Sequence, residues 1–189
     1  SLYSNKDIFL RELISNSSDA LDKLRFESLT QTEALPEKEL HIFLEVDPKS
    51  RTLTVHDNGI GMSRQEVTDH IGTIARSGTK EFLKLAKEQK QQKLTPELIG
   101  QFGVGFYSVF MVAEWVRVTS HSFNPQAEAV SWYATGDDNY QISRAEMSGR
   151  GTKVEIKLKE DAAEFAEEYR LKNIIHKHSD YIGFPIYVG

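Results

Sequence analysis

The first part of the chain combines a helical pattern of apolar positions with an alternating one. Apolar residues recur at helical spacing from about Asp7 to Leu29, which predicts one long helix with a single apolar face: Leu10, Leu13, Ile14, Leu21 and Leu24. From Glu37 to His56, apolar and polar residues alternate on both sides of a turn at Asp47-Pro48-Lys49-Ser50, which predicts a β-hairpin. Ser63 and Glu66 form a capping-box pattern, so we expect a second helix to begin at Ser63.

The later part of the chain is rich in β-branched and aromatic segments separated by turn residues. We predict strands in five of them: Trp115 to His121, Ala129 to Thr135, Tyr140 to Glu146, Thr152 to Leu158 and Pro185 to Val188. The charged stretch from Glu164 to His178 predicts another helix. Helices cluster early and antiparallel strands late, which favours an α+β fold, a two-layer α/β sandwich with helices over one face of a mostly antiparallel sheet.

Length and composition fit one domain over residues 1–189, without a repeat or a linker. The net charge of −5 argues against a general nucleic-acid binder, and no apolar run approaches the roughly 20 residues of a membrane span. The absence of cysteine excludes disulfides, thiolate zinc sites and a cysteine nucleophile. The chain has no signal-peptide pattern. Because it begins at Ser1 without a start methionine and runs quickly into a helical pattern, we expect a fragment that has lost its natural start.

Four polar residues follow one line along the first predicted helix: Glu12, Asn16, Asp19 and Lys23. Spacings of 4, 3 and 4 put them within roughly 60° of one another, at the border of the apolar face, where side chains line a cleft. Asn16 could offer an oxygen to Mg²⁺, and Glu12 could accept a proton from an attacking water. The simpler interpretation is a solvated face with pairs such as Asp19–Lys23, and the helix alone favours it.

Two glycine loops carry further candidates. Asp57-Asn58-Gly59-Ile60-Gly61 is either an ordinary turn or a loop in which Asp57 accepts a hydrogen bond from an exocyclic amino group beside a flat base. The segment Gly100 to Gly105 opens a predicted apolar helix, and it is either a flexible turn or a nest of backbone N–H groups for phosphate oxygens. It is not a P-loop, because no Gly-Lys-Ser/Thr follows, and it lacks the third glycine of the dinucleotide fingerprint. In this order the helix and the loops would supply metal, base and phosphate contacts.

Three long segments resemble one family. Phe9 to Lys23, Gly72 to Lys80 and Ile99 to Ser108 are similar to the signatures of the GHKL nucleotide-binding superfamily, and within it to the ninety-kilodalton heat-shock chaperones of bacteria and mitochondria. The resemblance covers essentially the whole chain and implies the Bergerat ATP-binding fold of an N-terminal domain. Gyrase B subunits, histidine kinases and MutL-type proteins share the order of the motifs but not these long segments.

The resemblance also implies a role for each matched position. Glu12 would be the general base of ATP hydrolysis, Asn16 would hold Mg²⁺, and Asp57 would bind the adenine amino group, helped by ordered water near Thr152. Residues Gly72 to Phe106 would form a lid over ATP or ADP. The remaining implied nucleotide contacts are Asp19, Lys23, Ile60, Gly61, Met62, Arg76, Gly100, Gln101, Phe102, Gly103, Val104, Gly105 and Phe106.

The resemblance further implies a molecular chaperone that works as a homodimer on client proteins in the cytoplasm of bacteria, with the mitochondrial matrix as the alternative. It implies no nucleic-acid or membrane partner and an isolated domain that is monomeric. The family's N-terminal strand, which dimer partners exchange, and its middle-domain arginine are expected to lie outside this chain, so we predict nucleotide binding with very little turnover. Asp69-His70 stands where some relatives carry asparagines, so ligand selectivity could differ there. A different class, a nucleotide-gated binding module without useful hydrolysis, stays open.

Overall fold

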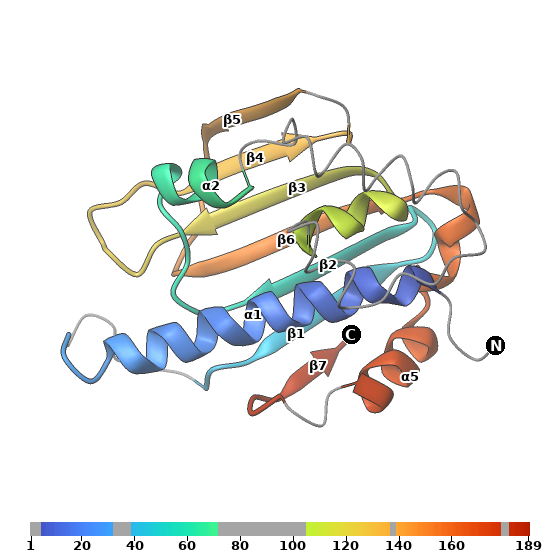
Figure 1. Ribbon diagram of the computed structural model, residues 1–189, viewed down its shortest axis with the longest axis horizontal. Coiled ribbons are helices and arrows are strands. Elements are labelled where there is room, and N and C mark those ends of the chain that lie inside the picture. Colours follow the sequence, from blue (N-terminus) through green and yellow to red (C-terminus); the bar gives the residue numbers. More distant parts are fainter. Residues whose placement is uncertain (1–4, 32–38, 72–104, 137–138, 179–181) are drawn as a thin grey trace.

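The computed structural model describes residues 5–31, 39–71, 105–136, 139–178 and 182–189 (Figure 1). Arg76 and the segment from Gly100 to Val104 therefore lie outside the described residues, as does most of the expected lid. In chain order the helical and strand elements are η1 Asn5–Asp7, α1 Ile8–Glu27, β1 Ile42–Asp47, β2 Thr52–Asp57, α2 Arg64–Ile71, η3 Gly105–Met111, β3 Ala113–His121, β4 Val130–Ala134, β5 Tyr140–Arg144, β6 Gly151–Leu158, η4 Glu160–Ala166, α5 Glu168–His178 and β7 Ile186–Val188.

The strands form one sheet in the order β5-β4-β3-β6-β2-β1-β7. Every neighbouring pair is antiparallel except β1 and β7, which are parallel. Helix α1 runs along one face of this sheet, with α2 and η3 on the same side (Figure 1), and it packs against β1, β2 and η3. The α+β prediction, helices over one face of a mostly antiparallel sheet, is confirmed.

The core lies between this helical layer and the sheet. Leu53 pairs with Ile156, and Ile156 in turn pairs with Val116, so the register aligns fully buried aliphatic side chains across three strands. The apolar residues predicted for the first helix, Leu10, Leu13, Ile14, Leu21 and Leu24, are all buried. Among the described helices, none combines the length with the hydropathy that crossing a bilayer requires.

Two expectations about helices need correction. The stretch from Glu164 to His178 is not one helix, because Glu167 adopts an extended conformation (φ −99°, ψ 125°) that separates η4 from α5. The break lets Arg170 on α5 bind Glu164 on η4 and also Asp7 at the start of α1, each at 2.8 Å. The apolar run after Gly105 forms a 3₁₀ helix rather than an α-helix.

The predicted capping box is present at the start of α2. The backbone N–H of Ser63 donates to Glu66 Oε1 at 3.0 Å, and the N–H of Glu66 donates to Ser63 Oγ at 3.2 Å. These reciprocal bonds fix the beginning of a helix of eight residues whose buried side chains are Val67 and Ile71.

Candidate functional site

A cavity of about 420 Å³ opens between α1, the loop after β2, α2 and η3. Every described member of the predicted site lines it, from four separate parts of the chain: Glu12, Asn16, Asp19, Lys23, Asp57, Ile60, Gly61, Met62, Gly105, Phe106 and Thr152. The structure therefore brings the polar stripe of the first helix, the first glycine loop and the end of the second glycine loop into one place. The helix alone favoured a merely solvated face, and its position beside this cavity removes that preference.

Helix α1 forms one wall of the cavity. Its apolar face packs on the sheet, and the stripe beside that face meets the cavity, with Glu12 half-buried and Asn16 and Asp19 exposed. Burial raises the pKa of Glu12, the nearby Arg11 cation opposes this effect, and the negative charge of Asp19 adds to it. A raised pKa makes the Glu12 carboxylate a better proton acceptor, which suits a general base.

Asp57 is the buried acid of the cavity. Its side chain is only 3% exposed, and its carboxylate accepts hydrogen bonds from the N–H of Gly59 at 2.9 Å, from the Ser17 side chain and from the N–H of Thr152. Burial nevertheless raises the pKa of Asp57 to about 7, because the loss of hydration outweighs these three donors. A buried carboxylate that lines a cavity is a strong acceptor for a ligand N–H group.

The loop after Asp57 needs both of its glycines, because its backbone lies very close to α1 and to the end of β3. A Cβ atom on Gly59 would lie 2.7 Å from the carbonyl carbon of Ala20 on α1. Gly61 has φ +68°, and a Cβ there would lie 1.9 Å from the carbonyl oxygen of His121. The loop is therefore held between α1 and the end of β3, and this contact turns Ile60 and Met62 to the cavity.

The sequence did not identify several polar residues of the site. Ser17 donates to Asp57, Glu66 of α2 lines the cavity, and Ser120 lies beneath it with no exposed surface. The position one residue after Asn16 was the signal for Ser17. His70, which the sequence named as a place where ligand selectivity could differ, also lines the cavity. No sequence pattern indicated Ser120, because its position beside the site depends on the pairing of β3 with β6.

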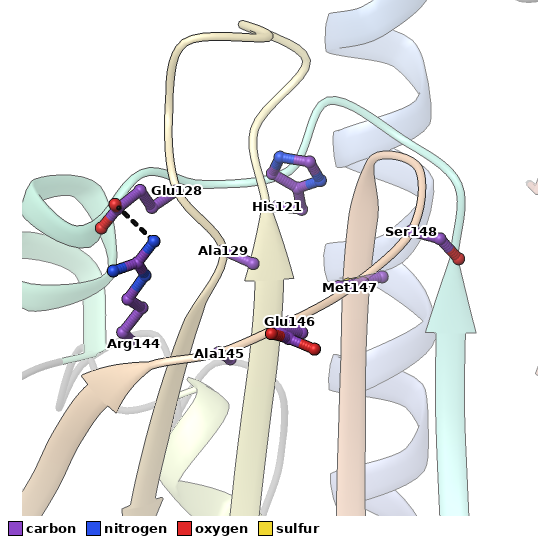
Figure 2. Close-up of a pocket in the computed structure, with 8 residues that line it drawn as sticks. All are labelled: His121, Glu128, Ala129, Arg144, Ala145, Glu146, Met147 and Ser148. Carbon is purple, nitrogen blue, oxygen red and sulfur yellow. Dashed lines mark ion pairs between the residues drawn. The ribbon is translucent and has the colours of Figure 1, made fainter.

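A larger hollow of about 820 Å³ lies where β3 ends, between residues 121–129 and 144–148 (Figure 2). Figure 2 shows Glu128 and Arg144 joined by an ion pair at its rim, at 3.2 Å and with both side chains well exposed. This ion pair is thus solvated, whereas the smaller cavity contains the buried Asp57. We therefore assign the site to the smaller cavity.

No group of three or more His, Asp or Glu side chains within the described ranges could hold a metal ion by itself. Asn16 offers one amide oxygen at the cavity wall. A hard cation bound there would need further oxygen ligands from a phosphate group and from water, an arrangement that Mg²⁺ commonly adopts.

Comparison with known proteins gives two kinds of match. Residues 3–168 match the model of the histidine kinase-, DNA gyrase B- and HSP90-like ATPase family. The chain is 48% identical over 190 aligned residues to the chaperone protein HtpG of Chlorobium chlorochromatii, an alignment that covers all of this chain. It is 52% identical over 188 residues, or 98% of its length, to HtpG of Actinobacillus succinogenes. The chain spans about 30% of the length of each of these curated relatives.

Proposed function

The chain belongs to the histidine kinase-, DNA gyrase B- and HSP90-like ATPase family, and from this premise we propose that its 420 Å³ cavity binds ATP and ADP. The observation that carries the proposal is the convergence of the α1 stripe with Asp57 on one cavity. Asp57 supplies a buried acceptor for a nucleobase, and Glu12 supplies a half-buried carboxylate for an attacking water. Asn16 supplies an exposed amide for a metal–phosphate unit.

The base of the nucleotide binds at Asp57. Its carboxylate accepts a hydrogen bond from the exocyclic amino group of adenine, while Ile60 and Met62 pack on the ring and Gly61 allows the backbone to approach it. Support comes from the 3% exposure of Asp57, because its three protein donors leave a lone pair of this buried carboxylate for a ligand donor. Its pKa, which burial raises despite those donors, shows the cost of its lost hydration.

The phosphates extend from the base toward Asn16 and Gly105. Mg²⁺ held beside Asn16 would neutralise phosphate charge. Glu12 orients a water molecule and takes up its proton when that water attacks the terminal phosphate, so that ADP and phosphate result. Asp19 and Lys23, further along the same stripe, border the phosphate path. Arg76 and the segment Gly100 to Val104 are included in the proposed nucleotide site on the family resemblance alone.

The whole protein is proposed to be a chaperone. HtpG proteins of 48% and 52% identity carry that name, and the resemblance adds a homodimer with client proteins, closure of a lid over ATP and a bacterial cytoplasmic location. Hydrolysis in that dimer needs parts beyond the 189 residues, so the isolated chain is expected to bind nucleotide with very little turnover. Fast steady-state hydrolysis by the isolated chain would contradict this part of the proposal.

Calorimetric titration of the chain with ADP, with and without Mg²⁺, tests the site. We expect saturable binding that Mg²⁺ strengthens, and no binding to Asp57→Asn under the same conditions. Glu128→Gln, on the exposed ion pair of the larger hollow, is the matched control and should bind ADP like the wild type. Absence of heat and of thermal stabilisation at millimolar ADP would rule out the site.

A further inference from the structure

Ser120 on β3 is completely buried beneath the nucleotide cavity. The backbone N–H of Met62 donates to Ser120 Oγ at 2.8 Å, Thr152 Oγ1 lies 2.7 Å from Ser120 Oγ, and the carbonyl oxygen of Gly151 lies 3.2 Å from it. Thr152 lines the cavity, while Ser120 does not. Ser120 thus has no access to a ligand and can act on one only through its neighbours.

Counting protons favours one direction for these bonds. Ser120 Oγ has one proton and two lone pairs, and the Met62 N–H occupies one lone pair. Gly151 O can only accept, so the bond to it uses the Ser120 proton. Thr152 then donates its own proton to the second lone pair of Ser120, one of the two directions open to this contact. In the opposite arrangement Ser120 Oγ and Gly151 O would face each other at 3.2 Å with no proton between them.

The Thr152 hydroxyl is left with only lone pairs to offer to the cavity. Its backbone partner across the sheet is Asp57, and the Thr152 N–H also donates to the Asp57 carboxylate. Ionised Asp57 is an acceptor as well. Two neighbouring side chains at the base-binding end of the cavity therefore accept hydrogen bonds and neither donates.

We propose that Ser120 is a positioning residue that sets the Thr152 hydroxyl as an acceptor and so selects purines with a 6-amino group against purines with a 6-oxo group. This inference rests on the proposed nucleotide site. An amino group brings two N–H donors to two acceptors, whereas a carbonyl oxygen in its place meets lone pairs on both sides. Sites built for a hydrogen-bond donor reject analogues that lack it, because buried polar groups are left unpaired.

The test compares the affinities for ADP and inosine diphosphate, at pH 8 so that Asp57 is ionised, by calorimetry. Wild-type protein is expected to prefer ADP. In Ser120→Ala the Thr152 proton is free to turn to the cavity, so the preference for ADP should fall about threefold to tenfold, the value of one hydrogen bond. Ser131→Ala, which removes another buried serine, one on the neighbouring strand outside the site, should leave the preference unchanged.

A double-mutant cycle separates this role from a merely structural one. Thr152→Val removes the hydroxyl and should weaken the binding of ADP without weakening the binding of inosine diphosphate. This result does not depend on the folding of Ser120→Ala. Adding Ser120→Ala to Thr152→Val should then leave the preference unchanged, because Ser120 acts through Thr152. The inference is overturned, while ADP binding stands, if Ser120→Ala changes the preference for ADP equally in the wild type and in Thr152→Val. It is also overturned if Ser120→Ala alone leaves that preference unchanged. A wild-type chain that binds neither nucleotide overturns the proposed function and this inference together.

Discussion

The backbone N–H of Ile60 donates to the carbonyl oxygen of Ala20 at 3.1 Å, which attaches the loop after β2 to the side of α1. The same loop is bound at its other side, where the N–H of Phe123 donates to Ile60 O at 2.8 Å. Through these two bonds the helix that carries Glu12 and the loop that begins at Asp57 become walls of one cavity. The nearby glycines permit that contact.

Gly61→Ala should destabilise the protein far more than Gly149→Ala. Both glycines have positive φ, +68° and +75°, so alanine costs about 1–2 kcal/mol at either position. Only at Gly61 would the added Cβ meet backbone, at 1.9 Å from His121 O, whereas at Gly149 nothing lies within 4 Å. Thermal unfolding and ADP titration should show a large loss of both stability and binding for Gly61→Ala. Equal effects of the two variants would refute a tight contact between this loop and β3.

Glu12→Gln should separate binding from hydrolysis in the proposed full-length dimer. The amide keeps the shape of the side chain but cannot take a proton, so ADP affinity should change less than about threefold while turnover falls about 10²–10⁴-fold. Glu66→Gln is the control, because Glu66 lines the same cavity and glutamine preserves its capping bond to Ser63. Unchanged turnover in Glu12→Gln would favour a nucleotide-gated binding module in place of an ATPase.

The stability of the nucleotide-free chain should fall as pH rises toward neutrality, and Asp57→Asn should reduce that fall. The folded-state pKa of Asp57 is about 7, above its ordinary value of 3.8, so between these values the folded protein binds the proton more tightly than the unfolded chain does. Stability from this group is complete below pH 4 and is lost as pH rises through 7.

Between pH 5 and pH 8 the difference in unfolding free energy between wild type and Asp57→Asn should change by about 2–3 kcal/mol. Urea unfolding of both proteins at several pH values measures it. The other titrating groups are common to the two proteins, so their contributions cancel in the comparison. If the unfolding free energies of the two proteins change in parallel with pH, Asp57 does not undergo the desolvation that the structure indicates.

Arg170→Met should cost about 3–5 kcal/mol of stability. Arg170 binds the nearly buried Asp7 at 2.8 Å, and its removal leaves that carboxylate without its cation at the start of α1. Lys172→Met on the same helix is the control, because its pair with Glu168 is exposed on both sides and should be worth less than about 1 kcal/mol. Chemical denaturation of the two variants measures this difference in stability. A similar small loss of stability in both variants would contradict the prediction.

The amino-acid sequence by itself determined the local elements and the chemical groups of the site. The spacing of Leu10, Leu13 and Leu21 defined the face of α1 that is buried, and the alternation around Asp47 defined the hairpin of β1 and β2. The same helical spacing put Glu12, Asn16 and Asp19 on one line at the border of that face. These features follow from periodicities of 3.6 and 2 residues, which act between neighbours in the chain.

Only the tertiary structure decided which of these groups meet. Asp57 and Glu12 share a cavity because Ile60 binds Ala20, and Ser120 reaches Thr152 because β3 pairs with β6. The break at Glu167 likewise accompanies the contact of Arg170 with Asp7 across most of the chain. Such contacts depend on strand order and register, which are set by burial of the whole sheet against α1, and no local pattern of residues contains that information.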